Sequence, residues 1–313
     1  MTEYKQDLFR YVAEEFTEDF HEGELERREF LRRMTLLGGG VVGARTLIAS
    51  LGIAGVSAAE LAQAQTAPPQ PDKASGAGMV DPRDPSIVVG PVTYTANGFT
   101  NLAYVARPAG NAPAPGILVI HENKGLQPHI QDVARRLAKA GYIAMAPDLM
   151  SKVGGTQQYI DTAQISSYLA QVSGDEHIVN LKAAVAVLKT QPGVQGLGAI
   201  GFCFGGGLAW RLSTELPELK AVVPFYGPAP DTAKVPDIKA AVFGAYGATD
   251  TRINAGIPPL EAALKAAGAA YQLKQYEGAG HAFNNDTGQS YVKSAANAAW
   301  ADAMAWFMKY LKS

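Results

Sequence analysis

The 313-residue chain contains a single cysteine, Cys203, and five histidines. One thiol cannot form an internal disulfide, and no group of His and Cys residues has metal-ligand spacing, so neither a metal nor another cofactor is expected. The chain also lacks a large excess of charge of either sign, because it contains 27 Lys and Arg and 29 Asp and Glu residues. Seven of those basic and eleven of those acidic residues precede residue 65, which leaves 20 against 18. This balance gives no reason to expect nucleic acid or an anionic membrane as a partner.

The single cysteine stands in the run 199–206 (AIGFCFGG), which is typical of a strand that ends in a sharp turn before a helix. The run has the pattern of a G-x-S-x-G nucleophile elbow with cysteine in the serine position. Gly201 and Gly205 lie where a Cβ would collide with the tight strand–helix crossing. The helix N-terminus favours the thiolate, and the amide of Phe204 points to where an oxyanion would form. A structural cysteine on an ordinary strand–helix turn remains open from this run alone.

Two further residues follow in the order that such an elbow requires, an acid and then a histidine. His281 is the one histidine after Cys203, and Asp250 lies between them in the loop after a predicted buried strand. Taken singly, they could be a surface-loop histidine and a turn-forming aspartate. Asp286 and Asp148 are rival acids, but both break the chain order. The three residues together indicate a nucleophile, a base and an orienting acid.

These motifs make residues 86–313 resemble the dienelactone hydrolase family of the α/β-hydrolase superfamily. The resemblance rests on the elbow, the Asp250 loop, the run 280–283 (GHAF) and the run 117–122 (ILVIHE). It implies that Glu122 contacts the resting cysteine and that the amide of Asn123 is the second oxyanion donor. Glu122 could equally be a strand-end residue that faces water.

The chain departs from the family at the substrate carboxylate. Members that act on dienelactones hold this group with two arginines, and the matching positions here are Asn285 and Lys152. Asparagine cannot form a charge-assisted bidentate pair, and lysine lacks the planar fork of arginine. Arg252 is a substitute cation, unless it braces the Asp250 loop. Ester or lactone hydrolysis is compatible with these changes, whereas a dienelactone substrate is in doubt.

Aromatic residues and a cap segment are expected around the pocket. Residues 150–175 are predicted to form a lid or cap helix, with Tyr159 or Tyr168 facing the substrate. Four aromatic side chains are expected to wall the pocket, although ordinary core packing suits each of them: Phe202, Phe204, Tyr226 and Phe283.

A second motif lies near the start of the chain, where 27–33 (RREFLRR) precedes an apolar, Gly-rich stretch. It resembles a twin-arginine export signal. A membrane anchor is the alternative, which the glycines at 38–40 and Arg45 disfavour. Cleavage is expected after Ala64, with a second small-x-small site at Val56-Ser57-Ala58. The sequence assigns no role to the long acidic segment before Arg27.

The domain division that follows is a signal peptide at 1–64, a flexible lead at 65–85 and a catalytic domain at 86–313. The export machinery is an expected partner, and the expected location is the bacterial periplasm or the exterior. No stable membrane association is expected after cleavage.

Strands and helices alternate in the catalytic part. The sequence predicts strands at 86–95, 101–107, 116–120, 142–146, 197–202, 221–225, 240–246 and 271–276, and helices at 130–140, 177–190, 206–214, 259–267 and 290–311. Such alternation predicts an α/β fold with a mostly parallel sheet covered on both faces. Ligands of such sheets bind beyond the carboxyl ends of the strands, where the three candidate residues fall.

The expected function is hydrolysis of a small-molecule ester or lactone through an acyl-enzyme on Cys203. Glu122 is expected to protect the resting thiol from oxidation. A thioesterase or a peptidase-like acyl hydrolase is an alternative on the same scaffold. A non-catalytic binding protein is the alternative from another class.

Overall fold

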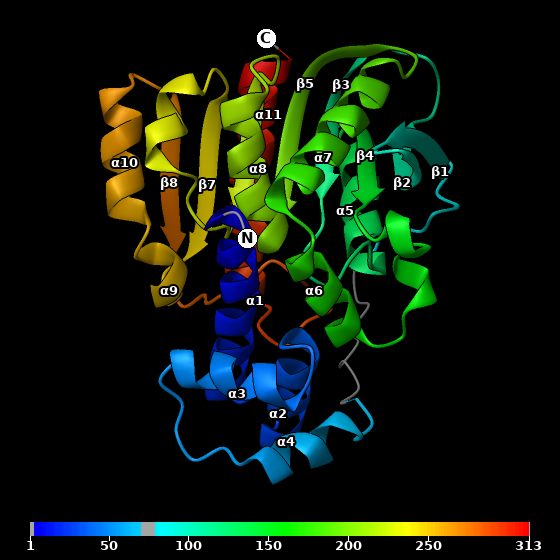
Figure 1. Ribbon diagram of the computed structural model, residues 1–313. Coiled ribbons are helices and arrows are strands. Elements are labelled where there is room, and N and C mark those ends of the chain that lie inside the picture. The colour runs from blue at the N-terminus through cyan, green and yellow to red at the C-terminus, as the bar shows by residue number, and fades with distance from the viewer. Residues whose placement is uncertain (1–2, 70–78, 313) are drawn as a thin grey trace.

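The computed structural model describes residues 3–69 and 79–312 (Figure 1). An eight-stranded sheet forms its centre, in the order β1-β2-β4-β3-β5-β6-β7-β8. The strands are β1 (Ile87–Ala96), β2 (Phe99–Pro108), β3 (Ala114–Ile120), β4 (Ile143–Asp148), β5 (Val194–Phe202), β6 (Ala221–Phe225), β7 (Ala241–Gly247) and β8 (Tyr271–Tyr276). All eight predicted strands are present, and their ends differ from the prediction by a few residues at most.

The pairing of the strands confirms the predicted α/β-hydrolase fold. β1 pairs with β2 and β2 with β4 in antiparallel fashion, whereas the remaining pairs from β4 to β8 are parallel. Every residue of β3, β4, β6 and β7 is buried. Strands covered on both faces need a continuous apolar run, which explains why these segments were readable as buried strands.

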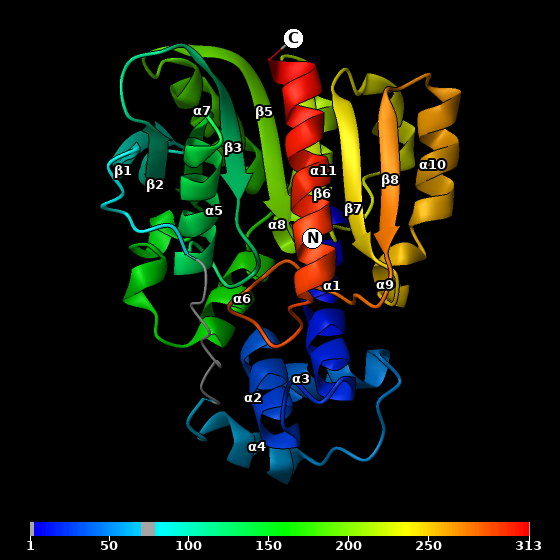
Figure 2. The same ribbon diagram turned by 180° about the vertical axis from the view of Figure 1, so that it is seen from behind.

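Helices cover both faces of the sheet. α7 and α8 lie on the face seen in Figure 1, and α11 lies on the opposite face, seen in Figure 2. The helices after the first strand are α5 (Pro128–Lys139), α6 (Thr162–Gln171), α7 (Gly174–Lys189), α8 (Phe204–Glu215), α9 (Thr251–Asn254), α10 (Ile257–Ala266) and α11 (Lys293–Leu311), with 3-10 turns η1 (Ser151–Val153), η2 (Thr156–Gln158) and η3 (Thr232–Asp237).

The turn from β5 to α8 is the expected nucleophile elbow. Cys203 has a φ of 55°, in the left-handed region that L-residues rarely adopt. A Cβ on Gly201 would overlap the carbonyl oxygen of Gly205, and a Cβ on Gly205 would overlap the backbone oxygens of Ile120 and His121. The two glycines therefore allow the close crossing of strand and helix that holds the cysteine in this strained position.

The N-terminal segment forms four helices that pack on the catalytic part. They are α1 (Glu3–His21), α2 (Arg27–Leu37), α3 (Val41–Ser50) and α4 (Ala58–Gln65). Figures 1 and 2 place them beyond the carboxyl ends of the strands, where α1 packs against α2 and α6. Phe16, Phe30 and Met34 are fully buried there and belong to the same apolar core as the sheet. We call residues 3–65 the cap.

The predicted boundaries around the cap remain predictions. The expected cleavage bond after Ala64 lies in the last turn of α4, and Ala64 itself is buried. Residues 70–78 of the expected flexible lead are outside the described residues. After them, the amide of Val80 donates to Asp132 of α5 at 2.6 Å. Within the described ranges, no helix is both long and apolar enough to cross a membrane.

The segment 150–175 contains two 3-10 turns and α6, so one helix is present where a cap helix was expected. Ser166 of α6 donates to the carbonyl of Asn123 at 2.9 Å, and Ser167 donates to the carbonyl of Leu36 at 3.1 Å. α6 therefore lies between the active-site loops and the cap, and it does not form the outer lid itself.

Candidate active site

Four candidate side chains meet at the carboxyl edge of the sheet. Cys203 follows β5, Asp250 follows β7, His281 follows β8 and Glu122 follows β3. All four are at most 7% exposed. Parallel strands bring their carboxyl ends to one edge, so Glu122 and His281, 159 positions apart in the sequence, share one site.

The acid and the base form a close pair. Nδ1 of His281 lies 2.6 Å from Oδ2 of Asp250, whose other oxygen accepts the amide of Ile253 at 3.1 Å. Burial alone would raise the pKa of Asp250, but the hydrogen bond and charge of His281 hold it below its usual range. Burial alone would lower the pKa of His281, but Asp250 and the neighbouring Cys203 raise it well above its usual value. The pair fixes the imidazole with Nε2 turned away from the carboxylate.

The thiol of Cys203 is bound by α1. It donates to the carboxylate of Glu15, with Sγ 3.3 and 3.4 Å from the two oxygens. The hydroxyl of Tyr11 lies 3.3 Å from the same sulfur. A ring nitrogen of His281 lies within 4.8 Å of this sulfur and of a Glu15 oxygen. Nε2 of His281 is buried and has no hydrogen-bond partner among the described residues. The nucleophile is therefore near its base and is bound to the cap instead.

This environment disfavours the thiolate. Burial is the main reason that the pKa of Cys203 rises to about 11, and the negative charge of Glu15 adds to the rise. The nearby His281 acts in the opposite direction and lowers it. Near neutral pH the sulfur consequently carries its proton in this structure.

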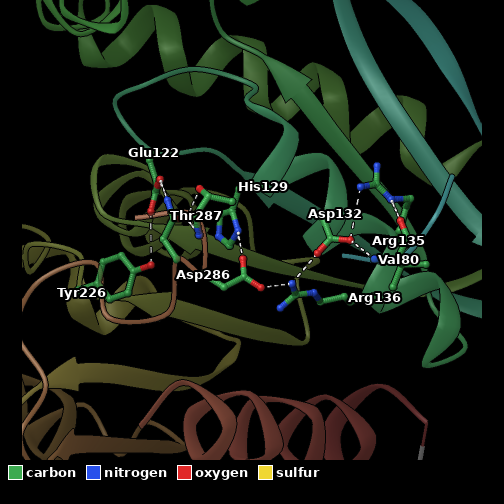
Figure 3. A network of polar contacts seen from close by, with 10 residues as sticks. Val80, Glu122, His129, Asp132, Arg135, Arg136, Tyr226, Asp286 and Thr287 are labelled. Carbon is green, nitrogen blue, oxygen red and sulfur yellow. Dashed lines mark hydrogen bonds and ion pairs between the residues drawn. The ribbon is translucent and has the colours of Figure 1, made fainter. Parts of the chain in front are cut away.

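Glu122 is held by residues other than the cysteine. Asn285 donates to one carboxylate oxygen at 2.8 Å, and the hydroxyl of Tyr226 lies 3.5 Å from the other (Figure 3). Asn285 also accepts from the amide and hydroxyl of Thr287, which fixes the orientation of its amide group. The resemblance placed Glu122 against the resting thiol, whereas the hydrogen bonds of that thiol go to Glu15. The role of Glu122 stays a prediction.

The two rival acids have other partners. Asp286 lies 3.1 Å from Nδ1 of His129 and pairs with Arg136, which also pairs with Asp132 (Figure 3). Asp148 accepts from the amide of Met150 and from the amide and hydroxyl of Thr156, so it fixes the loop after β4. Asp250 is thus the acid that the structure pairs with His281.

A cavity of about 390 Å³ opens beside Cys203 and His281. Its lining includes Glu122, Asn123 and Asn285 from the catalytic part, together with several side chains of the cap: Glu15, Asp19, Glu22, Glu24, Leu25 and Arg33. The cap therefore forms one wall of the space in which a substrate would bind.

Several expected pocket residues do not line this cavity. Lys152 lies on the surface and pairs with Glu176 at 2.9 Å, because η1 directs it away from the site. Arg252 forms an ion pair with Glu18 of α1 at 2.8 Å and does not line the cavity, so its guanidinium binds the cap. Six aromatic side chains are also absent from the lining. Four are fully buried in the core, and the last two are partly buried and pack against it: Phe202, Phe204, Tyr226, Phe283, Tyr159 and Tyr168. Asn285 does line it.

Tyr226 retains a place beside the triad although it does not line the cavity. Its ring packs edge-on against His281, with centroids 5.2 Å apart, and its hydroxyl reaches Glu122. Its expected contact with substrate is therefore replaced by contacts with two site residues.

Tyr11, Glu15 and Glu18 are residues of the site that the sequence did not predict. They occupy positions i, i+4 and i+7 of α1 and so face one side of that helix. This spacing is a signal for a helical face, but the partner of the face becomes evident only from the tertiary structure.

Two sets of metal-ligating atoms occur among the described residues. Glu15, Cys203 and His281 form one, and Glu18, Asp250 and His281 form the other, each with its atoms within 4.8 Å of one another. Both sets join a cap carboxylate to members of the triad. An ion bound in either set would occupy the imidazole that the triad needs as a base.

Sequence comparisons identify the family of the chain. The profile of the dienelactone hydrolase family matches residues 102–311. A provisionally assigned carboxymethylenebutenolidase of Escherichia coli K12 is 32% identical over 246 residues, covering 74% of this chain and 91% of the relative. Another, of Methylorubrum extorquens, is 37% identical over 222 residues, covering 66% of this chain and 76% of the relative.

Solved structures give the same result. A provisionally assigned dienelactone hydrolase of Klebsiella pneumoniae superposes with a TM-score of 0.66 at 32% identity, covering 72% of this chain and 99% of that one. A dienelactone hydrolase-like promiscuous phosphotriesterase from metagenomic libraries has a TM-score of 0.65 at 26% identity, with the same coverage. With the profile, the relatives and the strand order in agreement, the chain belongs to the dienelactone hydrolase family.

Proposed function

We propose that the chain is an exported cysteine-dependent hydrolase of small esters or lactones. Family membership makes it a hydrolase of carboxylic ester or lactone bonds. The observation that supports cysteine as the nucleophile is the placement of Cys203 at the elbow, beside an imidazole paired with Asp250 at 2.6 Å. Nucleophile, base and orienting acid are the three parts that acyl transfer requires.

In the proposed reaction, Nε2 of His281 takes the thiol proton as Sγ attacks the substrate carbonyl. The amides of Phe204 and Asn123 hold the oxyanion that forms. Phe204 is the first residue of α8, where an N–H has no acceptor within the helix, and Asn123 lines the cavity. The tetrahedral intermediate collapses, and His281 gives its proton to the leaving alkoxide. Water, deprotonated by His281, then cleaves the thioester and releases the acid.

The residues at the two arginine positions of the family favour a neutral ester or lactone over a carboxylated dienelactone. Asn285 stands where the family uses an arginine, and it donates to Glu122 at 2.8 Å. Lys152, at the other arginine position, pairs with Glu176 at the surface. Neither position supplies the cavity with a cation that would hold a substrate carboxylate.

A substrate panel with wild-type protein and Cys203→Ala tests this proposal. The panel contains p-nitrophenyl esters, lactones, a carboxylated dienelactone, a thioester and a phosphotriester. It is applied to the full-length chain and to the processed product recovered from an exporting bacterium. Turnover of neutral esters that is lost in the variant supports the proposal. A preference for the thioester supports the alternative thioesterase, and no turnover on any member supports the binding protein.

We propose export by the twin-arginine route because of the sequence 27–33. Arg27 and Arg28 are exposed, whereas Arg32 and Arg33 are buried in ion pairs with Glu29. Arg27 binds Glu60 at 3.1 Å but stays exposed, so the first pair is the one that an export receptor can reach.

Replacing Arg27 and Arg28 with lysine is expected to leave the precursor in the cytoplasm. The measurement is the share of the chain in periplasmic and cytoplasmic fractions by immunoblot. Arg32→Lys with Arg33→Lys is the matched control and is expected to be exported. Normal export of the Arg27→Lys, Arg28→Lys variant would contradict this route.

A further inference from the structure

The first helix of the chain lies directly over the nucleophile. Glu15 accepts the thiol proton of Cys203 in a hydrogen bond, and Tyr11 contacts the same sulfur at 3.3 Å. Glu15 and Tyr11 are each 7% exposed, and Cys203 is 2% exposed. A substrate carbonyl must approach this sulfur within bonding distance. Glu15 lines the cavity together with Cys203 and is hydrogen-bonded to its thiol, so it stands beside the sulfur in the space that the carbonyl must enter.

Contacts around the site hold α1 in this position. Arg252, two residues after the catalytic acid, binds Glu18 through two nitrogens at 2.8 and 2.9 Å. The guanidinium of Arg252 also lies over the ring of Tyr11, 5.0 Å from its centre. Arg252 is 18% exposed and Glu18 17%, so water weakens this pair less than a surface pair.

A second attachment joins the cap to α6. Arg32 of α2 binds Asp161, the N-cap residue of α6, with nitrogen–oxygen distances of 2.6 and 2.9 Å. Arg32 also binds Glu29, and both side chains are at most 5% exposed. Planar bidentate contacts of this kind fix orientation as well as position. The cap is thus attached both to α6 and to the Asp250 loop.

The contacts with α1 oppose the first chemical step. The thiol donates its proton to Glu15, while Nε2 of His281 has no partner among the described residues. Burial and the negative charge of Glu15 raise the pKa of Cys203, whereas His281 lowers it, so the docked helix disfavours the thiolate that must attack.

The cap is additional to the fold that carries the chemistry. The family profile begins at residue 102, after all four cap helices. The Klebsiella structure is matched over 99% of its length by 72% of this chain. The family fold is therefore complete without a segment corresponding to the cap.

We propose that the carboxyl edge of the sheet is a docking surface for the acidic helix α1 of the same chain, and that the docked cap keeps the precursor inactive until the cap is released. The proposal rests on the proposed cysteine hydrolase, because a cap has an effect only over a working nucleophile. It also gives a role to the acidic segment before Arg27, which carries the Glu15 and Glu18 side chains that dock.

The export motif lies within the cap, in α2. Phe30 and Leu31 of the motif are buried against the rest of the chain, whereas Arg27 and Arg28 are exposed. If a receptor binds the Phe30 side chain together with the exposed arginines, Phe30 must leave its buried site. Cleavage after Ala64 would then separate the cap from the catalytic part.

The test is the rate at which iodoacetamide alkylates Cys203 in the full-length chain at neutral pH, followed by intact-protein mass spectrometry. The chain has one cysteine, so the mass change reports this thiol alone. The Tyr11→Ala, Glu15→Ala variant is expected to be alkylated at least about tenfold faster than wild type. The thiol becomes accessible, and it loses the negative charge of Glu15 that raises its pKa. Hydrolysis by the full-length chain is expected to rise in parallel.

The matched control removes the neighbouring pair on the outer side of the same helix. Arg10 and Glu14 have the same spacing and bind each other at 2.7 Å. The Arg10→Ala, Glu14→Ala variant is expected to be alkylated at the wild-type rate. Equal rates in all three proteins would overturn the proposal. Faster alkylation with lower hydrolysis would overturn it too, because Tyr11 and Glu15 would then act as part of the working site.

The results distinguish failure of the proposed inhibition by the cap from failure of the proposed hydrolase activity. Faster alkylation without turnover of any substrate leaves the docking in place and refutes the hydrolase. Full turnover and rapid alkylation of the full-length wild-type chain refute inhibition by the cap, while the proposed hydrolase activity stands. If the double variant fails to fold, as shown by its thermal unfolding, Glu15→Gln keeps the side-chain size and removes the charge. It is expected to raise the alkylation rate severalfold, and an unchanged rate would overturn the proposal.

Discussion

Cys203→Ala is expected to reduce kcat/KM for the preferred ester by about 10⁴-fold or more, since no other thiol can form the acyl-enzyme. This loss corresponds to about 5.5 kcal/mol of transition-state stabilisation. The substitution removes one sulfur atom from a position whose backbone is set by Gly201 and Gly205. The fold is therefore expected to persist, which thermal unfolding of the variant checks.

The comparison must use one form of the protein, either processed or full-length, because the cap affects the baseline. Rates with wild type and variant are measured at several substrate concentrations, so that kcat and KM are obtained separately. A loss confined to kcat indicates a nucleophile, whereas an increase in KM alone would indicate a binding contact. Near-normal turnover by Cys203→Ala would refute cysteine catalysis.

Asp250→Asn is expected to lower kcat by about 10³- to 10⁴-fold. The asparagine keeps the shape of the side chain but cannot stabilise the imidazolium, and its amide group favours the wrong tautomer of His281. The hydrogen bond at 2.6 Å is the contact that the substitution weakens.

The same variant is expected to change the pH profile. Asp250 helps to raise the pKa of His281, so its loss lowers that pKa. Because the reaction needs the neutral imidazole, the acid limb of the profile of kcat/KM then moves to lower pH. Asp286→Asn is the control, since Asp286 pairs with His129 and Arg136 instead. An equal loss in the control, or an unmoved acid limb in Asp250→Asn, would contradict the assigned role.

The sheet could be predicted because its strands are covered on both faces. Segments such as β3 and β7 must be apolar throughout, and this demand is visible in the sequence. Cys203, Asp250 and His281 could be brought together for a related reason. Each follows a parallel strand, and the ends of parallel strands meet at one edge.

The residues around the triad were harder to predict because their partners come from distant elements. The sequence offers Arg252 as a substrate cation, but in the structure it binds Glu18 of α1. The sequence predicts Phe283 and Tyr226 as pocket walls, but both pack in the core. An aromatic or charged residue near a strand end has several possible neighbours, and the choice among them depends on packing that a single sequence does not contain.

The cap was not predictable as a folded element. Its sequence has the pattern of an export signal, which indicates a segment to be removed rather than one that packs. The docking of α1 depends on contacts such as Glu15–Cys203, between residues 188 positions apart. The acidic character of the segment was visible, but its partner was not.

The most direct test of cysteine catalysis is the mass of the protein during turnover. The processed product is mixed with a p-nitrophenyl ester, quenched with acid within the burst and analysed by peptide mass spectrometry. The account predicts an acyl group on the peptide that contains Cys203, and none in Cys203→Ala. Hydrolysis of the ester with no acyl group on Cys203, or with the group on another residue, would contradict it.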